Sequence, residues 1–147
     1  MSLLAFLEGK EVDTHGRYLR DIWTFNDQQI EQTHNFIQWL FPLAVPSASV
    51  LGAPVLAEED ISPIHQSELA QDNLCQSANW YAAFLGRNDF WKKAYDHNHL
   101  RITRAIGSLR LLVDDDEADS FRIEVYSLLG DKLSTIPQKT RRFWDDA

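Results

Sequence analysis

The chain of 147 residues has little cysteine and no long apolar run. Its one cysteine, Cys75, cannot form an internal disulfide, which is typical of proteins of the reducing cytoplasm. Residues 1–7 lack the basic start of a signal peptide. No stretch approaches the roughly 20 apolar residues that a membrane-spanning helix needs. We therefore expect a cytoplasmic protein without a membrane partner.

Positive charge is also scarce in this sequence. There are 14 lysines and arginines against 22 aspartates and glutamates, so the formal net charge is -8. Such a charge repels phosphate backbones, and we expect no nucleic-acid partner. The length and a hydrophobic content of 44% fit one compact domain, which is predicted to span residues 1–147.

Apolar residues recur at helical spacing along most of the chain. No segment of convincing length alternates apolar and polar residues, so strands are not expected. The pattern predicts an all-α domain of about six or seven helices. A central helix is predicted over residues 26–41, because Pro42 cannot continue it. A long helix is predicted over residues 67–85, with Gly86 as its C-terminal cap.

The end of the predicted central helix, residues 33–42, reads T-H-N-F-I-Q-W-L-F-P. His34, Ile37 and Phe41 recur at three and four residues and are predicted to face the core. His34 is then either a core histidine held by one hydrogen bond or a ligand-binding or catalytic residue. Trp39 projects to the opposite side of the helix. It is either covered by the following loop or an exposed anchor of a binding surface.

Residues 42–57 include three prolines and one glycine, which prevent a continuous helix. The segment is too apolar for a free linker, and burying its side chains is favourable. It is therefore predicted to pack on the core as a long apolar loop. The alternative is a lid or a binding loop, since connections of this length are often functional.

A second distinctive stretch, residues 96–109, reads D-H-N-H-L-R-I-T-R-A-I-G-S-L. Asp96 can cap the helix that follows. His97, Arg101 and Arg104 fall at offsets of four and three, which places them on one helical face. Arginine forks suit carboxylate or phosphate, so this face is a candidate anion site. The alternative is that Arg101 and Arg104 pair with acids of the protein itself.

The last residues predict a short helix that begins after Pro137. Phe143 and Trp144 are predicted to pin this helix to the rest of the protein. Arg141 and Arg142 are too few for a nucleic-acid patch.

The sequence predicts no metal site, no cofactor and no catalytic residue. The acids at residues 114–117 fit a helix start and lack the alternating spacing of a calcium loop. Cys75 has no visible activating partner in the sequence. A zinc site would use Asp96, His34, His97 and His99. It is disfavoured because His97 and His99 are two residues apart, and residues at that spacing on a helix point to different sides.

Two motifs resemble one known family. The segment F-N-D-Q-Q-I-E-Q-T-H-N-F-I-Q-W-L-F-P-L resembles the signature of the conserved region of the opioid growth factor receptor family, and H-N-H-L-R-I-T-R-A-I-G-S-L is similar to its second signature. Shorter matches extend the likeness over most of the chain. They are F-L-E-G, G-R-Y-L-R-D-I, A-P-V-L and F-L-G.

The resemblance implies a stand-alone relative of bacterial type, made of the conserved region alone. Animal members of the family carry additional repeats and are described as nucleus-associated receptors for an enkephalin peptide. Peptide-hormone binding is not carried over to this chain. The family supplies no established catalytic residue that could be placed on His34 or His97.

Two hypotheses about function follow. The first is a binding module for an acidic small molecule, a peptide or a protein, held by aromatic contact and arginine forks. The alternative is a small enzyme acting on a phosphate- or carboxylate-bearing substrate, with His34 or His97 as acid or base beside Arg101 and Arg104. The residues favour the binding module, because no pair of nucleophile and base is visible. Its candidate binding residues are His34, Gln38, Trp39, His97, Arg101 and Arg104.

Overall fold

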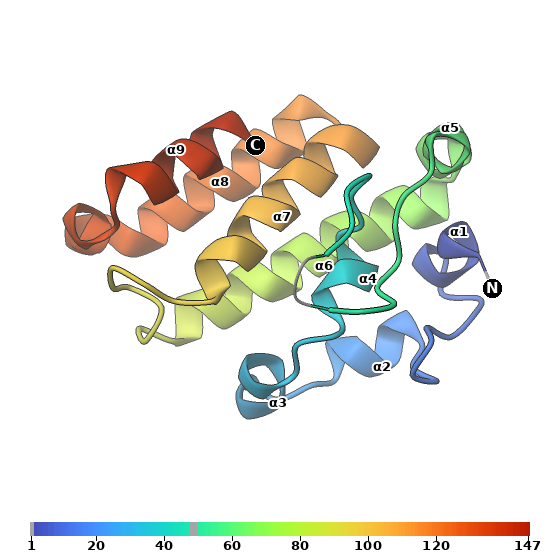
Figure 1. Ribbon diagram of the computed structural model, residues 1–147, viewed down its shortest axis with the longest axis horizontal. Helices are drawn as coiled ribbons and strands as arrows, with labels where there is room; N and C mark the ends of the chain where they lie inside the picture. The colour runs from blue at the N-terminus through green and yellow to red at the C-terminus, as the bar shows by residue number, and fades with distance from the viewer. Residues whose placement is uncertain (1, 48–49) are drawn as a thin grey trace. The chain divides into compact units, whose positions relative to one another are not determined.

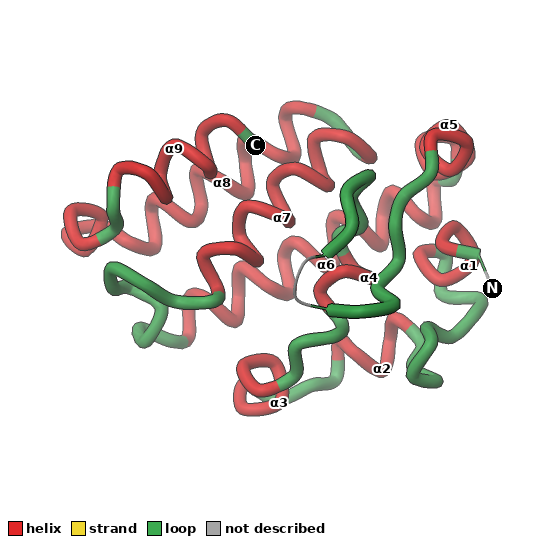
Figure 2. The backbone as a smooth tube through the Cα atoms, viewed as in Figure 1, coloured by secondary structure: helices red, strands yellow, loops and turns green. Residues whose placement is uncertain are grey.

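A computed structural model describes residues 2–47 and 50–147 of the chain. Within them the protein is all-α, as predicted, with helices joined by loops and no strand (Figure 1 and Figure 2). None of the described helices is both long enough and apolar enough to cross a membrane. The elements are α1 (Leu3–Leu7), α2 (Leu19–Trp23), α3 (Asp27–Gln32), α4 (Ile37–Leu40), α5 (Glu58–Gln66), α6 (Glu68–Arg87), α7 (Asn98–Leu112), α8 (Asp115–Leu129), the 3-10 helix η1 (Gly130–Thr135) and α9 (Gln138–Asp146).

Contacts between residues divide the chain into two compact units, Met1–Ser77 and Ala78–Ala147. The first unit holds α1 to α5 and the beginning of α6, and the second holds the rest of α6 with α7, α8, η1 and α9. The two units are described separately below. The single domain expected over residues 1–147 stays a prediction.

In the first unit, α1 packs against α4 and α5. Phe6 of α1 and Trp39 of α4 meet edge to face, with ring centroids 5.1 Å apart. Trp39 is therefore buried and not an exposed anchor, and a ring of α1 provides part of the cover that was predicted to come from the following loop. Burial of such an aromatic pair contributes strongly to the core.

The prediction of one central helix over residues 26–41 is wrong, because this stretch forms two separate helices, α3 and α4. Its start is confirmed, since the Asn26 side chain accepts from the backbone N–H of Gln29. The helix breaks at Thr33, whose backbone is extended. Just beyond the break, Arg17 donates to the side-chain and backbone oxygens of Asn35, both at 3.0 Å. These bonds stabilise the non-helical backbone that follows α3.

The long loop after α4 is buried in part. Pro42 and Leu56 are buried, and the Leu56 N–H donates to the Leu43 carbonyl at 2.9 Å. Val45 and Leu51 are exposed, so the loop is held to the core mainly at its two ends. The middle of the predicted loop includes residues 48 and 49, which lie outside the described residues.

In the second unit, α7 packs against both α8 and α9, and α8 runs antiparallel to α7 and α9 (Figure 1). Asp114 caps α8 by accepting from the Glu117 N–H at 2.8 Å, as predicted. Trp144 is fully buried and pins α9. Phe143 is 52% exposed, so its predicted role as a second pin is wrong.

Gly86 is not the C-terminal cap predicted for α6, because the helix continues to Arg87. Asn88 closes the helix instead, since its side-chain amide donates to the Phe84 carbonyl at 2.8 Å. A Cβ placed on Gly86 would lie 3.5 Å from Leu128 Cδ2, which is ordinary van der Waals contact. The position therefore accepts a larger residue.

We expect Gly86→Ala to raise the free energy of unfolding by about 0.5–1 kcal/mol, because glycine in a helix costs backbone entropy. Urea unfolding followed by circular dichroism measures this change. The matched control is Gly130→Ala, which should destabilise the protein because Gly130 has a φ of 49°. A loss of stability in Gly86→Ala would contradict the expectation and show that α6 and α8 need the glycine.

Candidate functional site

The three candidate residues of the first unit differ in exposure. His34 is exposed, so it is not the core histidine that one of the alternatives described. Gln38 is 5% exposed and its side-chain amide donates to the His34 carbonyl at 3.4 Å. Trp39 is equally buried. Of these three side chains, only that of His34 is exposed.

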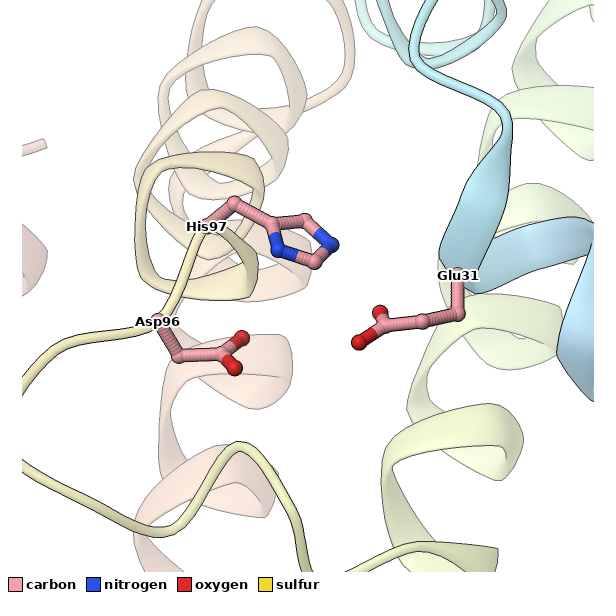
Figure 3. Close-up of side chains that lie close together, drawn as sticks. All are labelled: Glu31, Asp96 and His97. Atoms are coloured by element: carbon pink, nitrogen blue, oxygen red, sulfur yellow. The ribbon is translucent and has the colours of Figure 1, made fainter.

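The other three candidates lie at the beginning of α7 and along it. His97 is exposed, and Asp96 and His97 point their side chains to the same side (Figure 3). Arg101 is 6% exposed, and its Nη1 donates to Asn98 Oδ1 at 3.4 Å. Burial lowers the pKa of the Arg104 guanidinium from its ordinary value. The helix thus presents His97 to solvent and draws Arg101 into the interior.

A buried polar network surrounds Asn98, a residue that the sequence did not single out. Asn98 is fully buried, and its Oδ1 accepts from the Tyr81 hydroxyl at 2.6 Å. Its backbone N–H and its side-chain amide both donate to Asp96 Oδ1, at 2.9 and 2.8 Å. The Asp96 carboxylate therefore binds the first backbone N–H of α7 and also satisfies the buried amide, although the N-cap position itself is His97 and not Asp96 as predicted. This network holds the backbone around His97 in place.

His99 is the buried histidine of the second unit. Its Nε2 lies 2.8 Å from the Trp91 carbonyl, so this nitrogen carries the proton and donates. Its ring meets the Trp144 ring edge to face at 5.6 Å, and its carbonyl accepts from Trp144 Nε1 at 3.1 Å. His97 and His99 have different environments, as their spacing predicted. Through these contacts with Trp91 and Trp144, His99 links α7 to the loop before it and to α9.

A cleft of about 570 Å³ opens between the beginning of α7 and α9. Three large apolar side chains on its walls are exposed: Tyr95 by 83%, Leu100 by 73% and Phe143 by 52%. Leu100 lies outside the apolar stripe of its own helix, and this was the signal in the sequence that could have revealed the cleft. We call it the apolar groove. It is lined by residues 94–97, His99, Leu100, Thr103, Lys139, Thr140 and Phe143.

Charge is distributed unevenly between the two units. Met1–Ser77 has 3 basic and 11 acidic residues, whereas Ala78–Ala147 has 11 of each. The net charge of the protein is therefore carried by the first unit. The second unit holds most of the lysines and arginines, among them Lys139 at the apolar groove. The second unit has no net charge, so its overall field does not repel an anionic partner as that of the first unit does.

Comparison with known proteins identifies the family. The opioid growth factor receptor conserved region matches residues 10–90, which is more than half of the chain. The chain belongs to the opioid growth factor receptor conserved-region family. The matched range contains the first motif and ends before the second, H-N-H-L-R-I-T-R-A-I-G-S-L. The apolar groove also lies beyond that range, so its function has to be argued from this chain's own residues.

The similar curated relatives are much longer than this member of the family. The opioid growth factor receptor of Homo sapiens is 29% identical over 116 residues, that of Mus musculus 28% over 116 residues, and that of Rattus norvegicus 26% over 120 residues. Each match covers 65% of this chain and 17%, 18% and 20% of the relative, respectively. No solved structure matches the fold significantly.

Proposed function

We propose that this protein is a binding module that holds an acidic, peptide-like partner in the apolar groove. The observation that carries the proposal is the exposure of Tyr95, Leu100 and Phe143 around one cleft. Exposed aromatic and aliphatic side chains that gather at a concave surface are typical of binding sites. Tyrosine and phenylalanine also provide contact area at a small cost in side-chain entropy.

The shape and charge of the apolar groove favour a peptide with acidic residues. Apolar side chains of such a peptide would contact the walls, while Lys139 at the rim would attract carboxylates. The groove belongs to the unit without net charge, which does not repel an anionic partner as the acidic first unit does. The reducing environment suggested by the lone cysteine supports a cytoplasmic setting.

The candidate residues from the sequence take different parts in this proposal. His97 lines the apolar groove and can contact the partner directly. Arg101 is buried beside Asn98 and would act by shaping the beginning of α7. The enzyme alternative requires Arg101 to meet a developing negative charge. A guanidinium that is 6% exposed offers little access to a substrate, so the binding module is favoured.

Selection from a random displayed-peptide library tests the proposal. We expect the selected peptides to be acidic and to contain aromatic residues or leucine. Phe143→Ala and Leu100→Ala should each weaken a selected peptide's affinity at least about tenfold, because truncated anchor residues typically cost that much. Affinity is measured by fluorescence anisotropy with the labelled peptide.

Ile123→Ala is the matched control for these two variants. Ile123 is 60% exposed on α8 and does not line the apolar groove, so its truncation should leave the affinity unchanged. Selection of basic peptides would contradict the proposal, and so would binding that is insensitive to Phe143 and Leu100. Self-association that disappears in Phe143→Ala would assign the groove to a second copy of the chain and overturn the proposal.

A further inference from the structure

A second cleft, of about 440 Å³, lies between α8 and α9. Three arginines line it, Arg122 from α8 and Arg141 and Arg142 from α9. On α9, its residues fall on the helical face opposite Lys139 and Phe143, which line the apolar groove. We call it the arginine cleft. It lies on a separate face from the peptide site proposed above.

Two of its guanidinium groups lack an anionic partner among the described residues. Within residues 2–47 and 50–147, Arg141 and Arg142 form no ion pair. The Nε atoms of Arg122 and Arg141 are buried, and no acceptor in the described part of the chain reaches them. A buried donor without an acceptor costs free energy. The side chains of all three arginines line the cleft, so an oxyanion bound there would bring an acceptor to their guanidinium groups.

Other groups of the arginine cleft define where an anion could sit. The Tyr126 hydroxyl donates to Asp145 Oδ1 at 2.7 Å, and Arg122 Nη1 lies 3.4 Å from the same oxygen. Burial, and then the bond to Asp145, raise the pKa of Tyr126 to about 12, so the hydroxyl stays protonated at neutral pH. The negative charge of Asp145 thus already offsets part of the positive charge of Arg122. It would compete with a ligand for Arg122.

The geometry points to the arginine cleft as an oxyanion site that takes a phosphate monoester. A phosphate monoester carries nearly two negative charges and three acceptor oxygens. The two arginines without an ion pair among the described residues, Arg141 and Arg142, match the two negative charges of the monoester, whereas a carboxylate carries only one. Asp145 and Asp119 pair with Arg122, and Asp146 also lines the cleft. Arg141 and Arg142 form no ion pair in the described part of the chain and are the charges left for the ligand. The site does not depend on the proposed peptide groove.

The test follows the arginine Nε–H signals in proton–nitrogen NMR spectra while phosphoserine is added at constant ionic strength. We expect saturable shifts of the Arg122 and Arg141 signals. The double variant Arg141→Gln/Arg142→Gln should weaken binding at least about tenfold, since one charge-assisted bond contributes that much. Asp145→Asn should strengthen binding, because it removes the competing charge and keeps an acceptor for Tyr126.

Three controls separate binding in the arginine cleft from general charge effects and from misfolding. Arg20→Gln changes an exposed arginine of the other unit and should leave the affinity unchanged. Phe143→Ala should also leave it unchanged, so failure of the peptide groove and failure of the arginine cleft are distinguishable. Circular dichroism confirms that each variant is folded.

Three results would overturn the inference. The first is the absence of saturable shifts with phosphoserine. The second is equal binding of acetate, which would indicate a general surface charge. The third is binding of inorganic phosphate without binding of phosphoserine, which would exclude the monoester. Phosphoserine binding at least as tight as that of inorganic phosphate supports it.

Discussion

Trp144→Ala is expected to lower the free energy of unfolding by about 3–5 kcal/mol, the usual cost of removing a buried tryptophan side chain. Trp144 is fully buried. Its ring meets the rings of His99 and Tyr126 edge to face, at 5.6 and 6.0 Å. Its Nε1 donates to the His99 carbonyl at 3.1 Å. The variant loses the side chain that attaches α9 to α7, and urea unfolding measures the cost.

Two further variants control this result. Phe143→Ala truncates a neighbouring aromatic residue that is 52% exposed, and we expect a change within about 0.5 kcal/mol. Trp144→Phe keeps most of the apolar area and removes the hydrogen bond to His99, so it should cost less than Trp144→Ala. Equal costs for Trp144→Ala and Phe143→Ala would contradict the assigned role of Trp144. Because α9 carries one wall of each cleft, Trp144→Ala should also weaken peptide and phosphoserine binding.

Helix starts were predictable here because their signals are local. Asn26 and Asp114 each accept from a backbone N–H three residues ahead, as the capping pattern requires. Ser67 likewise accepts from the Ala70 N–H at 3.1 Å and begins α6. A hydrogen bond between a side chain and a backbone N–H three residues away does not depend on the rest of the fold. Sequence spacing alone is therefore enough to place it.

Features that depend on distant partners were not predictable in the same way. The break at Thr33 is supported by Arg17, which binds Asn35 from a turn 18 residues earlier in the chain. Helical spacing predicted that His34 faces the core. That spacing no longer indicates which side a residue faces once the helix is interrupted between α3 and α4. The buried histidine is His99 instead, and its acceptor is the carbonyl of Trp91 in the preceding loop.

The candidate site was predicted to lie on one face of a helix. In the structure His97 is exposed, whereas Arg101 is buried. Arg101 and Arg104 lie on α7 and His97 is the N-cap before it, yet spacing could not tell which of them the fold would cover. The exposed apolar side chains of the apolar groove come from α7 with the loop directly before it, and from α9, which is far from both in sequence. Periodicity describes one element at a time, so it does not reveal a surface built from several.

Asp13→Ala should also cost about 3–5 kcal/mol, because it removes one partner of a buried ion pair. The Asp13 side chain is fully buried, and its Oδ2 accepts from Arg17 Nε and Nη2, both at 2.7 Å. Its Oδ1 accepts from the backbone N–H groups of His15 and Arg17, at 2.8 and 3.0 Å. Arg17 in turn holds Asn35. The variant therefore leaves an uncompensated guanidinium and loosens the break between α3 and α4.

A double-mutant cycle separates the ion pair from its surroundings. Arg17→Met alone strands the buried carboxylate, whereas Asp13→Ala/Arg17→Met leaves no unpaired charge. The double variant should therefore cost less than the sum of the single variants, by about 1.5 kcal/mol or more. Asn35→Ala, measured in the same urea experiment, reports the separate contribution of the bonds from Arg17 to Asn35. Strictly additive costs for Asp13 and Arg17 would show that the two side chains act independently, and the pair would then not account for the bend at Thr33.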